Sequence, residues 1–236
     1  MNHTTAGSNC GQSIVQGKNT GMKLYTFYQS GSAYRVRIAL NLKGIDYEPI
    51  FVRGGQGSQE LRLPAYLQTN PQGVVPTLDH DGRVFMQSLP IIEYLEEIYP
   101  APPLLPIEVA DRQRVRALAQ LVVSDIHPLI TARVIDYLES RIVLTRERQQ
   151  DWLRHWNLSG LRTLEVLLAE DSRTGLYCHG DEPTLADVCL IPQVHTARRF
   201  NCDLSNLPTI ERIYDCCLAH PAFRRAAPEN QLDAQR

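Results

Sequence analysis

The sequence is poor in lysine. Of its 24 basic residues only Lys18, Lys23 and Lys43 are lysines, and the other 21 are arginines. The formal net charge is −2 at pH 7, so neither nucleic acid nor an anionic membrane surface is expected as a partner. The planar guanidinium of arginine suits carboxylate recognition. Because a genome-wide coding bias gives the same excess, arginine carries weight here only where a motif places it.

The cysteine patterns that bind zinc or build a disulfide framework are absent. No two of the six cysteines are spaced as C-x-x-C, and the last two are adjacent. We therefore expect no metal site and no disulfide framework. This cysteine usage fits a reducing, cytoplasmic compartment best. The cysteines are Cys10, Cys178, Cys189, Cys202, Cys216 and Cys217.

The sequence also lacks long apolar runs. None approaches the roughly 18–20 residues of a membrane-spanning helix. Residues 1–21 are polar and have no apolar core of a secretory signal. We interpret them as a disordered extension, a tag or an overlong start, with Met22 as the natural first residue of the fold. The 43 % of hydrophobic residues is enough for a packed core, and 236 residues allow one large domain or two modest ones.

Short β-like and helix-like segments alternate in the first part of the chain. Their predicted order is β-α-β-α-β-β-α, a thioredoxin-like α/β layout. Pro76 opens the third predicted strand, and a proline at that place in such folds commonly follows a cis bond. Gln87 and Ser88 precede the last helix and are expected to cap it. The predicted strands span residues 23–27, 47–52 and 83–86, with a further strand that follows the turn within residues 70–78, and helices are expected after Ser30, over 61–69 and after Ser88.

A proline-rich segment, residues 100–106, separates this part from the rest, because P-A-P-P-L-L-P can form neither a helix nor a central strand. After it the periodicity is helical throughout. We expect a thioredoxin-like domain over 22–102 and an all-helical domain over 108–236. Thr184 and Asp187 form a capping-box pattern, whose expected role is structural. The predicted helices span residues 112–126, 128–140, 146–168, 185–197 and 209–219, the last two ending the fold.

The chain is organised around residues 28–40, a strand-to-helix turn. Ser30 and Ser32 are N-cap residue types in front of a helix that Gly44 suits as a stop. Backbone N–H groups and the helix dipole stabilise an anion at such a place, and a thiol there ionises more easily. The stretch has no cysteine. Thiolate chemistry here would therefore need a sulfur from a bound ligand, and the alternative is an ordinary capped helix.

Five runs give the chain a resemblance to the cytosolic glutathione transferases, and within them to the zeta class. The resemblance extends from about Met22 to the C-terminus and implies the glutathione transferase fold, in which a thioredoxin-like domain joins a helical bundle. It also implies glutathione as cofactor and a homodimer. The runs are Y-R-V-R-I-A-L-N-L-K-G (34–44), N-P-Q-G-V-V-P-T-L (70–78), Q-S-L-P-I-I-E-Y-L-E-E (87–97), H-G-D-E-P-T-L-A-D-V-C-L-I-P-Q-V (179–194) and R-R-F-N-C-D-L (198–204).

The same resemblance implies a site between the two domains. Ser30 would donate to the glutathione sulfur, with Ser32 as a second catalytic hydroxyl. Val75 would pair its backbone with the cysteinyl unit. A second helix N-terminus would hold the γ-glutamyl carboxylate, as suits an anion. The glutathione-binding residues implied are Ser30, Gln72, Val75, Pro76, Gln87, Ser88 and His127.

The chain departs from the zeta pattern at the active-site turn. The pattern S-S-C-S reads S-G-S-A here, with Gly31 for the second serine and Ser32 for the cysteine. This version is closer to the maleylpyruvate isomerase branch. Gln29 stands where the family often has an arginine that grips a substrate carboxylate. Arg133 and Arg199 are the remaining candidates for that grip, and each could instead form a surface or core-edge ion pair.

The class includes maleylacetoacetate and maleylpyruvate isomerases, so the implied function is glutathione-dependent cis–trans isomerisation of a maleyl-keto acid. Maleylacetoacetate, an intermediate of tyrosine degradation, is the first choice, and the partner expected is a small dicarboxylic keto acid. Thiolate addition to a carbon conjugated to a carbonyl makes the double bond temporarily single, and glutathione is returned. Three alternatives stay open: maleylpyruvate as substrate, a general transferase or haloacid dehalogenase, and a non-catalytic binding protein.

Overall fold

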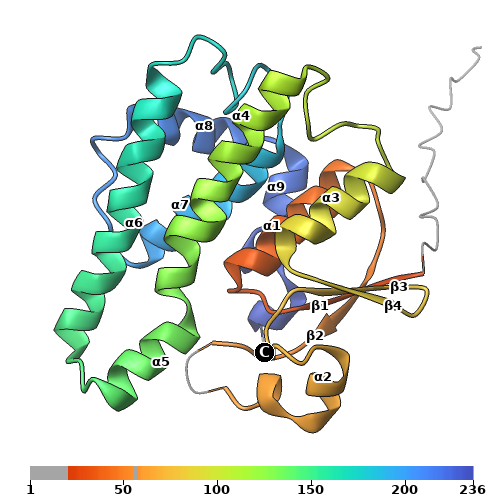
Figure 1. The fold of residues 1–236 in the computed structure, drawn as a ribbon, viewed down its shortest axis with the longest axis vertical. Coiled ribbons are helices and arrows are strands. Elements are labelled where there is room, and N and C mark those ends of the chain that lie inside the picture. Colours follow the sequence, from red (N-terminus) through yellow and green to blue (C-terminus); the bar gives the residue numbers. More distant parts are fainter. Residues whose placement is uncertain (1–20, 56–57, 236) are drawn as a thin grey trace, which may run out of the picture.

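The computed structural model describes residues 21–55 and 58–235. The extension expected over residues 1–21 lies outside the described residues, apart from Gly21. In Figure 1 a small sheet with its helices stands beside a larger group of helices, and α1 lies between the two. The described part of the chain therefore has an α/β portion followed by an all-helical one, as predicted.

A four-stranded mixed sheet has the order β2-β1-β3-β4. The first pair, β1 with β2, is parallel, and the other two pairs are antiparallel. Pro49 lies in β2, at the edge of the sheet, where its missing N–H breaks no central ladder. The strands are β1 (Met22–Thr26), β2 (Glu48–Phe51), β3 (Thr77–His80) and β4 (Arg83–Met86).

Three helices complete the α/β portion, and the β-α-β-α-β-β-α order is confirmed. Figure 1 shows α1 and α3 together on one face of the sheet and α2 at the other. Gly44, with φ of +63°, follows the end of α1 as expected of a helix stop. Lys43 pairs with Glu96 of α3 at 2.6 Å, which ties the end of α1 to α3. The helices are α1 (Gly31–Leu42), α2 (Pro64–Thr69, after a 3-10 turn η1 at Glu60–Arg62) and α3 (Ser88–Ile98).

The helical portion differs from the prediction in two places. The helix expected over 112–126 becomes π-helical over Leu121–Ile126, and the helix expected over 128–140 begins only at Ala132, after a 3-10 turn that contains Pro128, which has no N–H to continue an α-helix. A further helix, α9, follows the two that were expected to end the fold. The segments of the helical portion are α4 (Val109–Gln120), η2 (Leu121–Ile126), η3 (His127–Ile130), α5 (Ala132–Arg141), α6 (Arg146–Ala169), α7 (Leu185–Arg199), α8 (Pro208–Ala219), α9 (Pro221–Ala226), η4 (Pro228–Asn230) and η5 (Leu232–Gln235).

Helix α7 is the centre of the helical portion and packs on α1, α4, α6 and α8. Its N-terminus has the predicted capping box. The Thr184 side chain accepts from the helix, and Asp187 Oδ2 accepts from the Thr184 N–H at 2.8 Å. The second oxygen of Asp187 accepts from the Cys178 N–H at 2.8 Å. All of this is buried, so the cap fixes both α7 and the preceding loop.

Within the described residues, the helical stretch Val109–Arg141 is long and apolar enough to cross a membrane by length and composition alone. It is not an uninterrupted apolar run. Arg114 pairs with Asp171 and Arg116 with Glu93, and the stretch packs against α6 and α7. We therefore assign it to the core of the helical portion.

Candidate functional site

The predicted turn forms at the N-terminus of α1. After β1 the chain turns through residues 27–30, closed by a hydrogen bond from the Ser30 N–H to the Phe27 carbonyl at 3.0 Å. Ser30 is the N-cap of α1, and its Oγ accepts from the Ala33 N–H at 3.2 Å. Helix α1 has no acidic residue in its first turn. The positive end of the helix therefore keeps its capacity to bind an external anion.

Ser30 and Ser32 form a short chain of hydroxyls that ends on Val75. Ser32 Oγ donates to the Val75 carbonyl at 3.1 Å and lies 3.1 Å from Ser30 Oγ. A hydroxyl has one proton. With that of Ser32 on the carbonyl, Ser30 is the donor between the two serines. The structure thus brings both predicted hydroxyls to the Val75 backbone, and a stronger acceptor at this turn would compete for the Ser30 proton.

Side-chain hydrogen bonds hold the loop that carries Val75 in place. The Val74 carbonyl accepts from the Tyr66 hydroxyl at 2.6 Å and from Asn70 Nδ2 at 2.9 Å. The Val75–Pro76 peptide bond is cis, as predicted. Gln72 is joined to the loop through its N–H, which donates to Asn70 Oδ1 at 3.0 Å. The fixed loop holds the Val75 backbone beside the start of α1.

The start of α3 lies next to this loop but is not capped as predicted. Gln87 occupies the N-cap position with φ of +70°, and its side chain makes no capping bond. Its amide donates instead to Gln72 Oε1 at 2.6 Å. Ser88 is the first residue of the helix, and its buried hydroxyl accepts from Arg35 at 3.2 Å. The first turn of α3 also lacks an acidic residue, so its N–H groups can receive an anion.

The imidazole of His127 covers the start of α1 from the helical portion. A methyl group built on Gly31 would lie 3.4 Å from His127 Cε1 and 3.8 Å from Thr196 Oγ1. Burial lowers the pKa of His127 well below its usual value, and the charges of Arg35 and Arg133 lower it further. The ring is therefore neutral at pH 7 and can either donate or accept a hydrogen bond.

Arg133 and Arg199 flank the same region. The charge of Arg133 lowers the pKa of His127, and the side chain of Arg133 is exposed. The guanidinium of Arg199 lies 4.9 Å from the Phe200 ring centre; the residue is exposed, and its charge interacts with Tyr28. Neither arginine takes part in the ion pairs found among residues 21–55 and 58–235.

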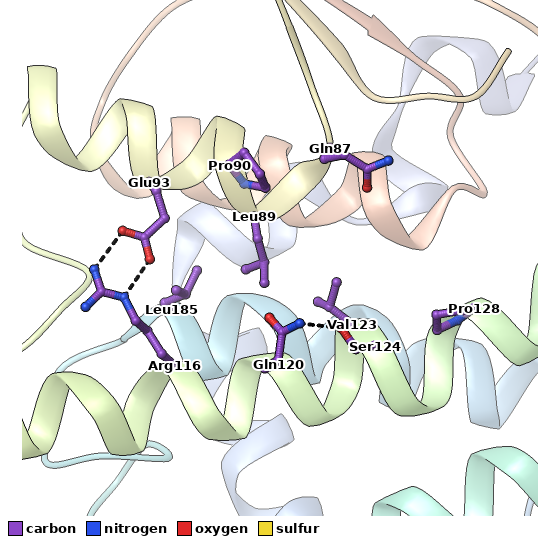
Figure 2. A pocket seen from close by; sticks show the side chains of 10 residues that line it. All are labelled: Gln87, Leu89, Pro90, Glu93, Arg116, Gln120, Val123, Ser124, Pro128 and Leu185. Carbon is purple, nitrogen blue, oxygen red and sulfur yellow. Dashed lines mark hydrogen bonds and ion pairs between the residues drawn. The ribbon is translucent and has the colours of Figure 1, made fainter. Parts of the chain in front are cut away.

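A cavity of about 550 Å³ opens between α3 and the α4–η2 segment (Figure 2). Of the predicted site residues only Gln87 lines it, at one end. The other end is bounded by the Glu93–Arg116 pair, joined at 2.8 and 2.9 Å. The remaining walls are mostly apolar side chains such as Leu89 and Val123. The cavity therefore adjoins the start of α3.

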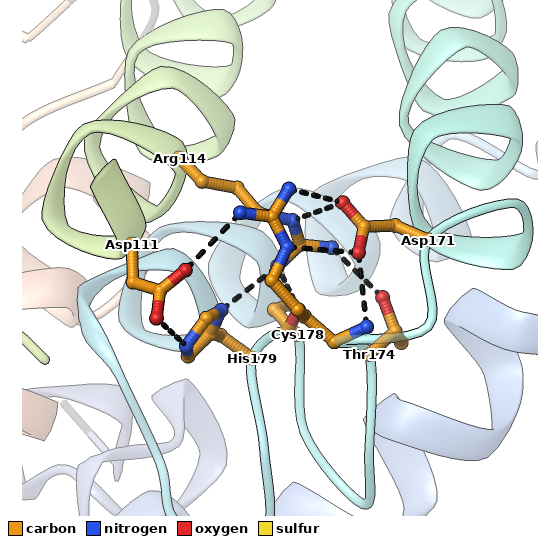
Figure 3. Close-up of polar contacts among 7 residues, drawn as sticks. Asp111, Arg114, Asp171, Thr174, Cys178 and His179 are labelled. Atoms are coloured by element: carbon orange, nitrogen blue, oxygen red, sulfur yellow. Dashed lines mark hydrogen bonds and ion pairs between the residues drawn. The ribbon is translucent and has the colours of Figure 1, made fainter. Parts of the chain in front are cut away.

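A second polar cluster lies away from these residues (Figure 3). Arg114 of α4 donates to Asp171 at 2.8 Å and to the Cys178 carbonyl at 2.8 Å. Arg173 bridges Asp171 and Asp111, and these hydrogen bonds hold the pKa of Asp171 far below its usual value. The groups satisfy one another. The cluster fixes the loop before α7.

Two residues at the site are not predicted from the sequence. Arg35 is buried behind Ser88, although the motif that contains it was recognised. Asp233, near the C-terminus, accepts from the Tyr28 N–H at 2.8 Å and so supports the turn before Ser30. A charged residue in an otherwise apolar helical run was a sign of the first. Nothing local marks the second, because its partner lies 205 residues away.

Comparison with known proteins assigns the chain to a family. Residues 24–103 match the glutathione S-transferase N-terminal domain. A maleylacetoacetate isomerase of Pseudomonas aeruginosa is 48 % identical over 213 residues, which cover 90 % of this chain and 98 % of the relative.

Two solved structures are similar to the whole described fold. A holo maleylpyruvate isomerase, a bacterial zeta-class glutathione S-transferase, has a TM-score of 0.87 and 46 % identity, with 90 % of this chain and 99 % of that chain covered. A maleylacetoacetate isomerase of Methylobacterium extorquens with bound malonate and glutathione has a TM-score of 0.87 and 44 % identity, with the same coverage. The chain belongs to the zeta-class glutathione transferases, the family of the maleylacetoacetate and maleylpyruvate isomerases.

Proposed function

We propose that this protein is a glutathione-dependent cis–trans isomerase of a maleyl-keto acid, with maleylacetoacetate as the first substrate to test. One observation carries the proposal. The start of α1 gathers two serine hydroxyls, a backbone carbonyl and a neutral histidine. The five cysteines among the described residues all belong to the helical portion, after residue 177. The site is suited to a thiolate that the chain itself does not supply.

Glutathione fits the residues present. It has a thiol, a cysteinyl backbone and a γ-glutamyl carboxylate, and the site offers a matching group for each. Ser30 and the α1 dipole suit the sulfur, and the Val75 backbone suits the cysteinyl unit. Ser88 and the start of α3, which has no acidic residue of its own, suit the carboxylate. Gln72 and Gln87, joined at 2.6 Å, form the adjacent edge.

When bound, glutathione supplies a nucleophilic thiolate that adds reversibly to a double bond conjugated to a carbonyl. The chain's own residues have three tasks. Ser30 would donate a hydrogen bond to the sulfur, which favours the thiolate and, together with the helix N-terminus, lowers the thiol pKa. His127, neutral beside Gly31, offers a hydrogen bond at the reacting end. Arg133 and Arg199 bind the substrate carboxylates, for which guanidinium groups are suited.

Gln29 is exposed at the turn, in place of the arginine frequent in the family. An amide cannot neutralise a carboxylate, so the two arginines of the helical portion have to supply the charge. The relative crystallised with glutathione also contains malonate, a small dicarboxylate. This supports a dicarboxylic substrate for the present chain and gives Arg133 and Arg199 their proposed role.

The family relationship further supports a homodimer and a cytoplasmic location, both of which we include in the proposal. Sedimentation of the purified protein over a range of concentrations tests the dimer. A single species of about 27 kDa at every concentration, close to the 26.7 kDa of one chain, contradicts it.

The experiment is to follow maleylacetoacetate and maleylpyruvate side by side, with and without glutathione, while free glutathione is counted. We expect isomerisation that requires glutathione and leaves its amount unchanged, and the ratio of the two rates identifies the preferred acid. Glutathione consumed in step with an electrophile indicates a conjugating transferase or a dehalogenase. No reaction with either acid or with electrophiles indicates a binding protein.

A further inference from the structure

Helix α1 carries two buried arginines that differ in how they are satisfied. Arg37 donates to four oxygen atoms, those of the Ala226, Phe27 and Tyr28 carbonyls and the Thr26 hydroxyl, at 3.0–3.2 Å. Arg35 is equally buried, with 1 % of its surface exposed, but makes one side-chain hydrogen bond, to Ser88. Its Nε and Nη2 have no partner. A buried guanidinium left in this state destabilises the ligand-free protein.

The described residues give Arg35 no carboxylate to balance its charge. The titratable groups on which its charge acts are His127 and Cys189. Burial lowers the pKa of the imidazole and raises the pKa of the Cys189 thiol to about 12, so both are neutral at pH 7. The positive charge of Arg35 is therefore uncompensated within the described chain.

The one hydrogen bond of Arg35 decides how Ser88 is oriented. A guanidinium can only donate, so the Ser88 oxygen accepts from Nη1 at 3.2 Å and its own proton is available for another acceptor. Ser88 opens α3, whose first turn has no acidic residue and whose N-cap side chain is turned towards Gln72. A hydroxyl proton, the free N–H groups of a helix and a buried cation thus meet at one place.

We propose that Arg35 is a positioning residue for glutathione. It acts as the buried counter-charge of the γ-glutamyl carboxylate and turns the Ser88 proton towards that carboxylate. The inference rests on the proposed function, since it assumes that glutathione binds at the start of α3. This role explains why the fold leaves a buried arginine only partly bonded. The unpaired guanidinium makes the ligand-free protein less stable, and the bound form is therefore favoured.

The test compares Arg35→Met with Arg37→Met, two substitutions of buried arginines on the same helix. Calorimetry measures the affinity for glutathione and for 4-aminobutyryl-cysteinylglycine, which lacks only the γ-glutamyl carboxylate. Urea unfolding measures the stability of the ligand-free proteins. We expect Arg35→Met to weaken glutathione binding at least tenfold, to leave the affinity for the analogue unchanged and to unfold at the same or a higher urea concentration.

Arg37→Met should behave in the opposite way, with a lower unfolding midpoint and an unchanged ratio of the two affinities. Ser88→Ala provides a second variant and should lower the same ratio if Arg35→Met does not fold. Wild-type protein that does not bind glutathione overturns the proposed function and this inference together. Wild-type protein that prefers glutathione over the analogue, with Arg35→Met retaining the full preference, or with Ser88→Ala retaining it where Arg35→Met does not fold, overturns only the role of Arg35.

Discussion

The N-terminus of α7 differs from those of α1 and α3 in how its unpaired N–H groups and partial positive charge are balanced. Each helix start offers unpaired N–H groups and partial positive charge. At α7 the chain fills the place with its own carboxylate, Asp187, which accepts three hydrogen bonds. At α1 and α3 it places no acidic residue in the first turn. A completed helix start holds the fold together, and an uncompleted one is available to a ligand.

The comparison also separates the two kinds of arginine at these places. Arg114 stands behind the α7 loop with two acidic neighbours in its network, and its donors are matched to acceptors. Arg35 stands behind the start of α3 with two donors unmatched. Of these two buried arginines, only Arg35 keeps donors that a ligand could use.

The largest loss of stability should come from removing the carboxylate at the start of α7. Asp187→Asn keeps the volume but turns an amide NH₂ towards N–H donors, and about 3 kcal/mol of unfolding free energy should be lost. Urea denaturation measures this. Asp203→Asn, an exposed carboxylate that also caps a turn, is the control and should stay within about 0.5 kcal/mol of the parent. Equal stability of the two variants contradicts a structural role for the capping box.

Ser30→Ala tests the start of α1, which has no carboxylate of its own. It removes the N-cap of α1, worth about 1 kcal/mol, and the proposed donor to sulfur, worth about 100-fold in kcat. Thr145→Ala is a matched control, because Thr145 caps α6 in the same way and lies outside the site. It should lose similar stability and no turnover. Undiminished turnover in Ser30→Ala removes this serine from the mechanism.

Acid should weaken the protein through His127. Because its pKa in the folded protein lies below the ordinary value, the unfolded chain takes up a proton first as pH falls through about 6.5. Stability is therefore full above that pH and declines below it, by up to about 1.4 kcal/mol per pH unit for one group. His195, whose pKa is also lowered, has the same sign.

Unfolding curves between pH 5 and pH 7.5 test this (about the range over which histidine titrates). His127→Asn should flatten the decline, and His195→Asn should remove a separate part of it. An unchanged slope in His127→Asn shows that this imidazole does not titrate below its ordinary pKa.

Gly31→Ala should have the smallest effect and sharpens the description of the turn. The added methyl would meet His127 Cε1 at 3.4 Å, an ordinary contact, and the loss of glycine flexibility should add about 0.5 kcal/mol. Gly160→Ala is the contrast. Its methyl would lie 2.2 Å from Ile126 Cγ1, so about 1–3 kcal/mol should be lost. Thermal unfolding of both separates a site with room from a packed helix contact.

Much of this arrangement could be predicted because it depends on nearby residues. The capping box at Thr184, the N-cap at Ser30 and the stop at Gly44 are local, and so was the order of strands and helices. The cap expected from Gln87 was wrong, since its side chain is held by Gln72 from another loop. Helix α9 was missed because its six residues are too few to show a period.

The unpredictable features are those that tertiary packing decides. The run Y-R-V-R-I-A-L shows that Arg35 and Arg37 are two residues apart, but not that one meets four acceptors and the other one. The roles of the predicted site residues remain proposals, and the structure contributes their positions. It places Ser30, Ser32, Val75 and His127 around one helix start.

The most direct test of the account is the pKa of the glutathione thiol in the bound state, read from the ultraviolet absorbance of the thiolate as pH is raised. The account predicts a pKa clearly below that of an ordinary thiol, about 8.5, and a return towards that value in Ser30→Ala. Bound glutathione whose thiol keeps the ordinary pKa in both proteins would contradict the claim that the start of α1 exists to hold a borrowed thiolate.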